Sequence, residues 1–269
     1  MYVHPKKALG QHFLRDLSVA QDIVDALLHV QIGEGCIAQK MQVLEVGPGT
    51  GVLTQFLLKR PDIDLRAVEI DKEAIDYLLT HFPSIEGRLI EADFLRLDLG
   101  ALFDAPFSVI GNFPYHISSQ IFFKALEERN RIPVVVGMLQ KEVAERIAAS
   151  PGSKTYGILS VLLQTWYEVE YLFTVPAHLF SPPPKVQSAV VRLKRNARNE
   201  LPCSETLFKQ VVKATFNQRR KAIRNSIRQV TGAAPLPEHP LLALRPEQLS
   251  VSQFIELTHF TLSLLPQRD

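Results

Sequence analysis

One short motif, Gly111-Asn112-Phe113-Pro114-Tyr115, carries groups suited to an aromatic amine. The exocyclic amine of adenine is a weak nucleophile because its nitrogen lone pair is delocalised into the ring. Hydrogen bonds from its two N–H groups to the Asn112 side-chain oxygen and the Phe113 carbonyl would draw the nitrogen towards tetrahedral geometry. Pro114 would rigidify the turn and keep Phe113 extended, and Tyr115 offers a face for a stacked base. A plain β-turn is the alternative interpretation.

A glycine-rich turn and two carboxylates indicate a cofactor site. The run Gly47-x-Gly49-x-Gly51 follows an apolar strand, and it differs from the G-x-G-x-x-G of dinucleotide binders. Glu69 closes the next strand, where a carboxylate can accept ribose hydroxyls. Asp93 closes the third strand, where it can accept a hydrogen bond from an adenine amine. The order predicts a nucleoside-bearing cofactor without a pyrophosphate, although each carboxylate alone could be a helix cap.

The elements that position these residues are expected to be alternating strands and helices. Buried strands are predicted for MQVLEV (41–46), DLRAVEI (64–70), GRLIEA (87–92), FSVIG (107–111) and IPVVVGML (132–139). Helical patterns between them predict parallel βαβ units, with helices at 51–59, 72–81, 118–128 and 141–149. Two later strands, at 167–175 and 188–195, flank the proline-rich SPPPK and indicate an antiparallel addition. The expected class is α/β, with the site at the carboxyl ends of the strands.

The C-terminal part of the chain is expected to be a small all-α domain. A polar stretch at 196–202 separates it, so the domains are placed at 1–198 and 199–269, with helices predicted at 204–216, 219–230 and 251–265. Between Thr206 and Pro237 there are seven basic residues and no acidic one, which leaves −5 for the rest of a chain whose net charge is +2. Such a basic segment predicts a polyanionic partner; a solvated helix face is the alternative.

Bulk properties narrow the class further. No run approaches the ~18 uninterrupted apolar residues of a transmembrane helix, and the N-terminus lacks the apolar region of a secretory signal. Cys36 and Cys203 lie far apart without metal-ligand spacing, so free thiols in a reducing compartment are expected. We expect a cytoplasmic protein without metal or membrane partner, and a monomer.

Taken together, the motifs resemble those of the ribosomal RNA adenine dimethyltransferases, in particular the bacterial small-subunit branch. The matching stretches are GQHFL, EVGPGTGVLT, AVEID, EADFL, GNFPYHIS, LQKEVAERI, FSPPPKVQSAVVRL, FNQRRKAIRNSI and LRPEQLSVSQFIEL. They extend from the N-terminus nearly to the end of the chain. The chain departs from the family pattern at His12, Phe113 and His116, without losing a group that the chemistry requires.

The resemblance implies a Rossmann-like methyltransferase domain, a small helical domain and S-adenosyl-L-methionine as cofactor. Carried across by motif, the cofactor contacts are His12, Leu14, Gly47, Glu69, Asp93 and Asn112. Phe180 would help Tyr115 to clamp the adenine, with Asn112 and Pro114 beside it. The residues implied to meet rRNA phosphates are Arg219, Arg220 and Lys221, and Arg224 lies in the same basic run. The expected substrate is a pair of adjacent adenines near the 3′ end of small-subunit rRNA, dimethylated during subunit maturation.

Other functions remain open at the level of sequence. A large-subunit rRNA methyltransferase of the antibiotic-resistance type would share the cofactor and Asn-x-Pro-Tyr signals. A non-catalytic assembly factor could keep the fold, but the intact glycine turn and Asn112 speak against it. A small-molecule methyltransferase would leave the basic segment unexplained, and the helical domain is small for reading DNA sequence in a groove.

Overall fold

The computed structural model describes residues 3–6, 9–28, 40–232 and 235–265. The chain forms two compact units, one of Met1–Ala144 with Glu168–Arg195 and one of Glu145–Tyr167 with Asn196–Asp269. The first unit contains the sheets. No helix in the described ranges is long and apolar enough to cross a membrane. Cys203 is a free thiol, and Cys36 lies outside the described residues.

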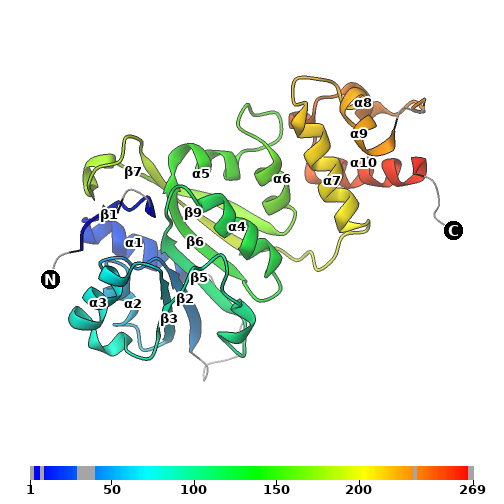
Figure 1. The fold of residues 1–269 in the computed structure, drawn as a ribbon. Helices are drawn as coiled ribbons and strands as arrows, with labels where there is room; N and C mark the ends of the chain where they lie inside the picture. The colour runs from blue at the N-terminus through cyan, green and yellow to red at the C-terminus, as the bar shows by residue number, and fades with distance from the viewer. Residues whose placement is uncertain (1–2, 7–8, 29–39, 233–234, 266–269) are drawn as a thin grey trace. The chain divides into compact units, whose positions relative to one another are not determined.

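A seven-stranded sheet organises the first unit (Figure 1). Its order is β4-β3-β2-β5-β6-β9-β7, and the bounds are β2 Met41–Val46, β3 Ile63–Glu69, β4 Leu89–Glu91, β5 Phe107–Asn112, β6 Val134–Gln140, β7 Tyr167–Val175 and β9 Ser188–Arg195. The strands from β4 to β6 pair in parallel, whereas β9 runs antiparallel to β6. The predicted α/β sheet, mostly parallel with an antiparallel addition, is confirmed.

The strand order reverses between β2 and β5, the point at which open α/β sheets bind ligands. Helices α2 (Thr54–Leu57), α3 (Lys72–His81), α4 (Ser118–Glu127) and α5 (Lys141–Ala148) follow the parallel strands at the expected places. The first is much shorter than predicted, because the glycine turn is not helical. In α3, the Asp71 side chain accepts the Glu73 N–H and caps the helix, and Ala74, Ile75 and Leu78 form its buried face.

Helix α1 (Leu17–Leu28), which the sequence pattern did not predict, covers one face of the sheet. Its Ile23 and Val24 are fully buried against alternate strand residues such as Ile110 and Val136. Burying a side chain of this size stabilises the fold by about 1.5–3 kcal/mol. Just before α1, strand β1 (Phe13–Leu14) pairs antiparallel with β8 (Phe180–Ser181) in a second, two-stranded sheet. This pairing fixes the segment that leads into α1.

The regular elements of the second unit are helices. They are α6 (Ile158–Gln164), α7 (Glu205–Asn217), α8 (Ile223–Ser226), α9 (Arg228–Thr231) and α10 (Val251–Leu264). Helix α7 is capped by Ser204, which accepts the Leu207 N–H, and α10 by Ser250, which forms a capping box with Gln253. The rings of Phe216 and Phe254 stack with centroids 5.8 Å apart and join the two long helices.

Two features of the second unit differ from expectation. The predicted helix at 219–230 begins only at Ile223, because Ala222 adopts an extended backbone, and it is divided at Ile227 into α8 and α9. The stretch Glu145–Tyr167, assigned to the first domain from sequence, makes its contacts with the C-terminal helices. A division of function between residues 1–198 and 199–269 stays a prediction.

Candidate active site

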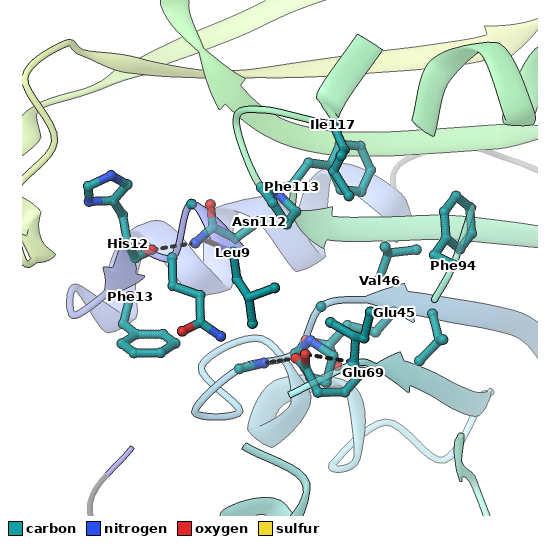
Figure 2. Close-up of a pocket in the computed structure, with 18 of the residues that line it drawn as sticks. Leu9, His12, Phe13, Glu45, Val46, Glu69, Phe94, Asn112, Phe113 and Ile117 are labelled. Atoms are coloured by element: carbon teal, nitrogen blue, oxygen red, sulfur yellow. Dashed lines mark hydrogen bonds between the residues drawn. The ribbon is translucent and has the colours of Figure 1, made fainter. Parts of the chain in front are cut away.

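A cavity opens at the carboxyl ends of the parallel strands in the first unit (Figure 2). Its lining comes from five stretches of the chain, at residues 9–14, 45–53 except 51, 68–70, 92–95 and 112–117. The predicted glycine turn, Glu69, Asp93 and the Asn112 motif all reach it. The fold therefore brings together residues that lie up to about a hundred positions apart.

The glycine turn keeps its backbone open to the cavity. Gly47, Gly49 and Gly51 have φ values of 67°, 56° and 79°, a region that side chains other than glycine rarely adopt. A Cβ on Gly47 would meet only Pro114 Cδ, at 4.0 Å, whereas one on Gly49 would lie 2.9 Å from Phe13 Cε1. The space beside Gly47 is thus free of other protein atoms and suits close approach by a ligand.

Glu69 is a buried carboxylate, 5% exposed, fixed by backbone N–H groups. Gly49 N donates to its Oε2 at 3.1 Å, and Ile70 N and Asp71 N donate to Oε1 at 2.8 and 2.9 Å. Burial raises the pKa of Glu69, although the three N–H groups favour its ionised form. A carboxylate has about four acceptor positions, so one position on Oε2 remains for a ligand hydroxyl.

Asp71 ties the N-terminal segment to this edge, a role that the sequence analysis missed. Lys6 Nζ lies 2.6 Å from its Oδ1, and Gln11 Nε2 donates to Oδ2 at 2.9 Å. Although burial opposes ionisation, these hydrogen bonds hold the pKa of Asp71 below its usual value. The sequence signal was only that of a helix cap, because nothing in the spacing of Lys6 and Gln11 points to Asp71.

Asp93 also lines the cavity. Its Oδ1 accepts the Leu95 N–H at 2.9 Å, and Arg96 Nε lies 3.6 Å from Oδ2. The first contact turns the chain after β4. The side chain remains one-third exposed, so it is accessible to a ligand despite its capping role.

The Asn112 amide is oriented by one hydrogen bond. Its Nδ2 donates to the backbone carbonyl of His12 at 2.9 Å, as Figure 2 shows. The amide oxygen is thereby the free acceptor, without a hydrogen-bond partner among the described residues. The Phe113 N–H donates to Met138 O at 2.9 Å, which anchors the next residue to β6. The sequence predicted both acceptors, and the structure places both residues at the cavity.

The bulky Phe113 ring fits because two neighbouring strands carry glycine. A Cβ on Gly111 would lie 2.9 Å from the ring, and one on Gly137 would come closer still. The ring is 1% exposed and packs edge-on against Phe122, with centroids 5.7 Å apart. Phenylalanine at this position therefore serves packing and leaves the backbone carbonyl in place.

Tyr115 is held beside the cavity by contacts from two other segments. Its hydroxyl lies 2.5 Å from Ser188 Oγ, and its ring stacks on the His12 imidazole with centroids 5.4 Å apart. His12 Nδ1 lies 2.8 Å from Pro182 O. The imidazole thus contacts Tyr115 and Pro182, while the His12 carbonyl serves Asn112. Pro114 lines the cavity next to them.

Leu14 and Phe180 are neighbours in the β1–β8 pair. Leu14 is 3% exposed and lines the cavity. Phe180 is 2% exposed, packs in the hydrophobic core with Leu14 and Val175, and does not line the cavity. The structure therefore does not place Phe180 in the cavity lining, where the expected adenine clamp would need it, and the clamp stays a prediction. The alternation of side chains along β8 directs the Phe180 ring into the core instead.

Glu45 is a third carboxyl at the cavity, one that the sequence analysis left without a role. It is 1% exposed, and Thr54 Oγ1 donates to its Oε2 at 2.7 Å. Burial raises the pKa of Glu45 to about 8, although the Thr54 hydrogen bond opposes the shift. At neutral pH this group is therefore largely a neutral acid.

In the second unit, the predicted phosphate-binding residues differ in their exposure. Arg220, Lys221 and Arg224 are exposed. Arg219 is only partly exposed, since its Nη2 donates to Ser153 O at 3.2 Å and its Nε lies 3.9 Å from Glu247 Oε2. Three of the four are free to meet an external anion, whereas Arg219 is engaged within its unit. Over the described ranges there is no group of three or more His, Cys, Asp or Glu side chains able to hold a metal ion.

A mostly parallel sheet that carries a glycine turn, a buried carboxylate and an Asn-x-Pro-Tyr motif at one edge is typical of a Rossmann-like methyltransferase. Residues 3–239 match the family model described as ribosomal RNA adenine dimethylase. The chain belongs to this family. It is 60% identical over 259 residues to the ribosomal RNA small subunit methyltransferase A of Bacteroides thetaiotaomicron, covering 96% of this chain and 94% of that one. The protein of the same description from Parabacteroides distasonis is 59% identical, with 95% and 93% covered.

Solved structures share the fold. A dimethyladenosine transferase from Plasmodium falciparum superposes with a TM-score of 0.73 at 23% identity, covering 94% of this chain and 98% of that chain. The 23S rRNA methyltransferase ErmE superposes with a TM-score of 0.64 at 25% identity, covering 92% and 99%. The predicted Rossmann-like methyltransferase fold is confirmed.

Proposed function

We propose that the protein transfers methyl groups from S-adenosyl-L-methionine to N6 of two adjacent adenines near the 3′ end of small-subunit rRNA, during maturation of the subunit. The observation that carries this proposal is the orientation of the Asn112 amide. Its nitrogen donates to the His12 carbonyl, so its oxygen is free to accept a hydrogen bond. The relatives described as small-subunit methyltransferases support the choice of subunit. A ribosomal substrate also agrees with the expected cytoplasmic location.

The cavity residues suit S-adenosyl-L-methionine. Gly47 leaves room for close approach, the Glu69 carboxylate has an open acceptor position for a ribose hydroxyl, and Asp93 is exposed enough to accept from an adenine amine. Leu14 adds apolar surface to the cavity, and His12 acts through its backbone carbonyl, which orients Asn112. When bound, the cofactor supplies an electrophilic methyl group. The Glu69 carboxylate nearby also suits a cationic ligand, whereas Glu45 is largely neutral.

The target adenine would be held by the Asn112 motif. Asn112 Oδ1 and the Phe113 carbonyl accept hydrogen bonds from the amine, Pro114 fixes the turn, and the Tyr115 ring stacks on the base. The amine nitrogen would bond to the methyl carbon as the bond from that carbon to the sulfonium sulfur breaks and a neutral thioether leaves, and the amine proton would pass to water, which needs no strong base. The contribution of these residues is alignment and local polarity. We do not extend the clamp to Phe180, because its ring is in the core.

The helical domain would supply affinity for the rRNA backbone. Arg220, Lys221 and Arg224 are the proposed phosphate contacts, since they are exposed. Phosphate contacts position an RNA without reading its sequence, so these residues do not select the adenines. We assign Arg219 to the internal packing of its unit instead.

A large-subunit substrate is the second candidate, favoured by the likeness to ErmE. Transfer of labelled methyl groups to isolated small and large subunits that lack adenine dimethylation would separate the two. We expect label in the small-subunit rRNA only. Label in the large-subunit rRNA alone would support the second candidate, and no label in either, with cofactor binding intact, would favour an assembly factor.

A further inference from the structure

The Tyr115 side chain is tethered through its hydroxyl to a distant strand of the large sheet. The hydroxyl pairs with Ser188 Oγ at 2.5 Å, across 73 residues of sequence. Ser188 begins β9, opposite Gln140 at the end of β6. The tether therefore starts from the regular part of the sheet and not from a loop.

The surroundings of Ser188 give its hydroxyl little freedom. The residue is fully buried, and the Tyr115 hydroxyl is the hydrogen-bond partner that the structure gives its Oγ. A buried hydroxyl without a partner costs about 1–3 kcal/mol, so each group holds the other. The His12 imidazole lies against the same ring, which leaves Tyr115 fixed at its tip and supported on a face.

We propose that Ser188 is a positioning residue that fixes the Tyr115 ring in the orientation in which it receives the target adenine. This inference rests on the proposed function of Tyr115. A tyrosine can rotate about two side-chain torsions, and stacking requires a defined ring plane. The tether removes that freedom before the base arrives, so binding of the base carries no entropic cost for ordering the ring. Ser188 does this without touching the base or the cofactor.

A double-mutant cycle tests the proposal. We expect Ser188→Ala to lower kcat/KM for small subunits roughly five- to tenfold, the loss of one ordinary hydrogen bond. The affinity for S-adenosyl-L-methionine should stay unchanged, because Ser188 does not line the cavity. In a Tyr115→Phe background, which removes the partner hydroxyl but keeps the ring, the same substitution should have no further effect. The matched control is Ser108→Ala, a fully buried serine on β5 whose hydroxyl has no partner in the described part of the chain; it should behave as wild type.

A readout independent of catalysis separates this inference from the proposed function. In protein labelled with 3-fluorotyrosine, the Tyr115 ¹⁹F resonance is the one lost in Tyr115→Phe. Ser188→Ala should shift that resonance, and Ser108→Ala should not. If small subunits are not methylated but the resonance shifts, the tether stands and the proposed function fails. Additive losses in the double mutant, or an unshifted resonance, would overturn the positioning role.

Discussion

At the scale of the residue, the chemistry depends on which atom of each polar group is already in use. The Asn112 nitrogen donates to the His12 carbonyl, and the amide oxygen stays free. Glu69 receives three backbone N–H groups and keeps one acceptor position. The Tyr115 hydroxyl is hydrogen-bonded to Ser188, which leaves a face of the ring available for stacking. In each case a protein contact orients the group and leaves the ligand-binding part open.

Replacing Asn112 with alanine should therefore remove transfer while leaving the protein folded. We expect the single-turnover rate of methyl transfer to small subunits to fall roughly a hundredfold or more, as for other positioned hydrogen-bonding groups at reacting centres. The circular dichroism spectrum should be unchanged. Near-normal turnover in Asn112→Ala would contradict the proposed role of the amide oxygen.

Glu45 should make stability depend on pH. Its pKa is about 8 in the folded protein, against the ordinary value of 4.5 expected after unfolding. Between these values the folded state holds a proton that the unfolded state has lost. Stability therefore falls as pH rises through this window, by up to about 1.4 kcal/mol per pH unit. Glu45→Gln, which cannot ionise, should flatten the pH dependence of urea unfolding across this window; an unchanged slope would show that Glu45 is already ionised when folded.

At the scale of the element, the glycine turn after β2 leaves open space beside Gly47 that its other two glycines, packed against phenylalanine rings, do not have. We predict that Gly47→Ala and Gly87→Ala each destabilise the fold by about 1 kcal/mol, because both positions have positive φ. A Cβ at Gly87 meets nothing within 4 Å and at Gly47 only Pro114 Cδ. Isothermal titration should nevertheless show a loss of S-adenosyl-L-methionine affinity for Gly47→Ala alone. Equal affinities in the two variants would place the cofactor elsewhere.

The elements that the sequence predicted well are those with strong local patterns. The strands from β2 to β6 were predictable because they are almost continuously apolar, and α3 because Asp71 caps an amphipathic run. Helix α1 and the β1–β8 pair were missed. The two paired strands are only two residues long and are stabilised by a partner more than 160 positions away. The late start of α8 at Ile223 coincides with a tertiary hydrogen bond, from Ile223 N to Leu244 O.

The same distinction holds for the candidate site. Its glycines, Glu69, Asp93 and Asn112 could be predicted because parallel strands bring their carboxyl ends to one edge. The roles of Asp71 and Ser188 could not, since each depends on contacts across 60 or more residues. For Phe180 the motif implied a ligand contact, whereas the structure places the ring in the core, and a contact with the adenine stays a prediction.

At the scale of the whole molecule, charge is concentrated in one part of a chain of modest net charge. The segment from Thr206 to Pro237 carries +7 while the chain carries +2. Within it, Lys209 is paired with Glu205 and Arg219 is engaged internally. The exposed remainder is the part able to attract RNA.

The internal and exposed arginines give a matched pair for testing RNA binding. Arg220→Ala and Lys221→Ala should each weaken binding to small-subunit rRNA and reduce the slope of log K against log salt by about one. Cofactor affinity should not change. Arg219→Ala should leave the salt slope unaltered and lower the melting temperature instead, because it loses contacts to Ser153 and Glu247. A wild-type salt slope in both exposed-site variants would remove their role as phosphate contacts.

The identity of the methylated nucleoside tests the central claim most directly. Small subunits lacking adenine dimethylation would be incubated with the protein and S-adenosyl-L-methionine, and their rRNA digested and analysed by mass spectrometry. We predict N6,N6-dimethyladenosine at two adjacent positions near the 3′ end, and none with Asn112→Ala. Methylation of another base, or of an adenine ring nitrogen in place of N6, would contradict the account.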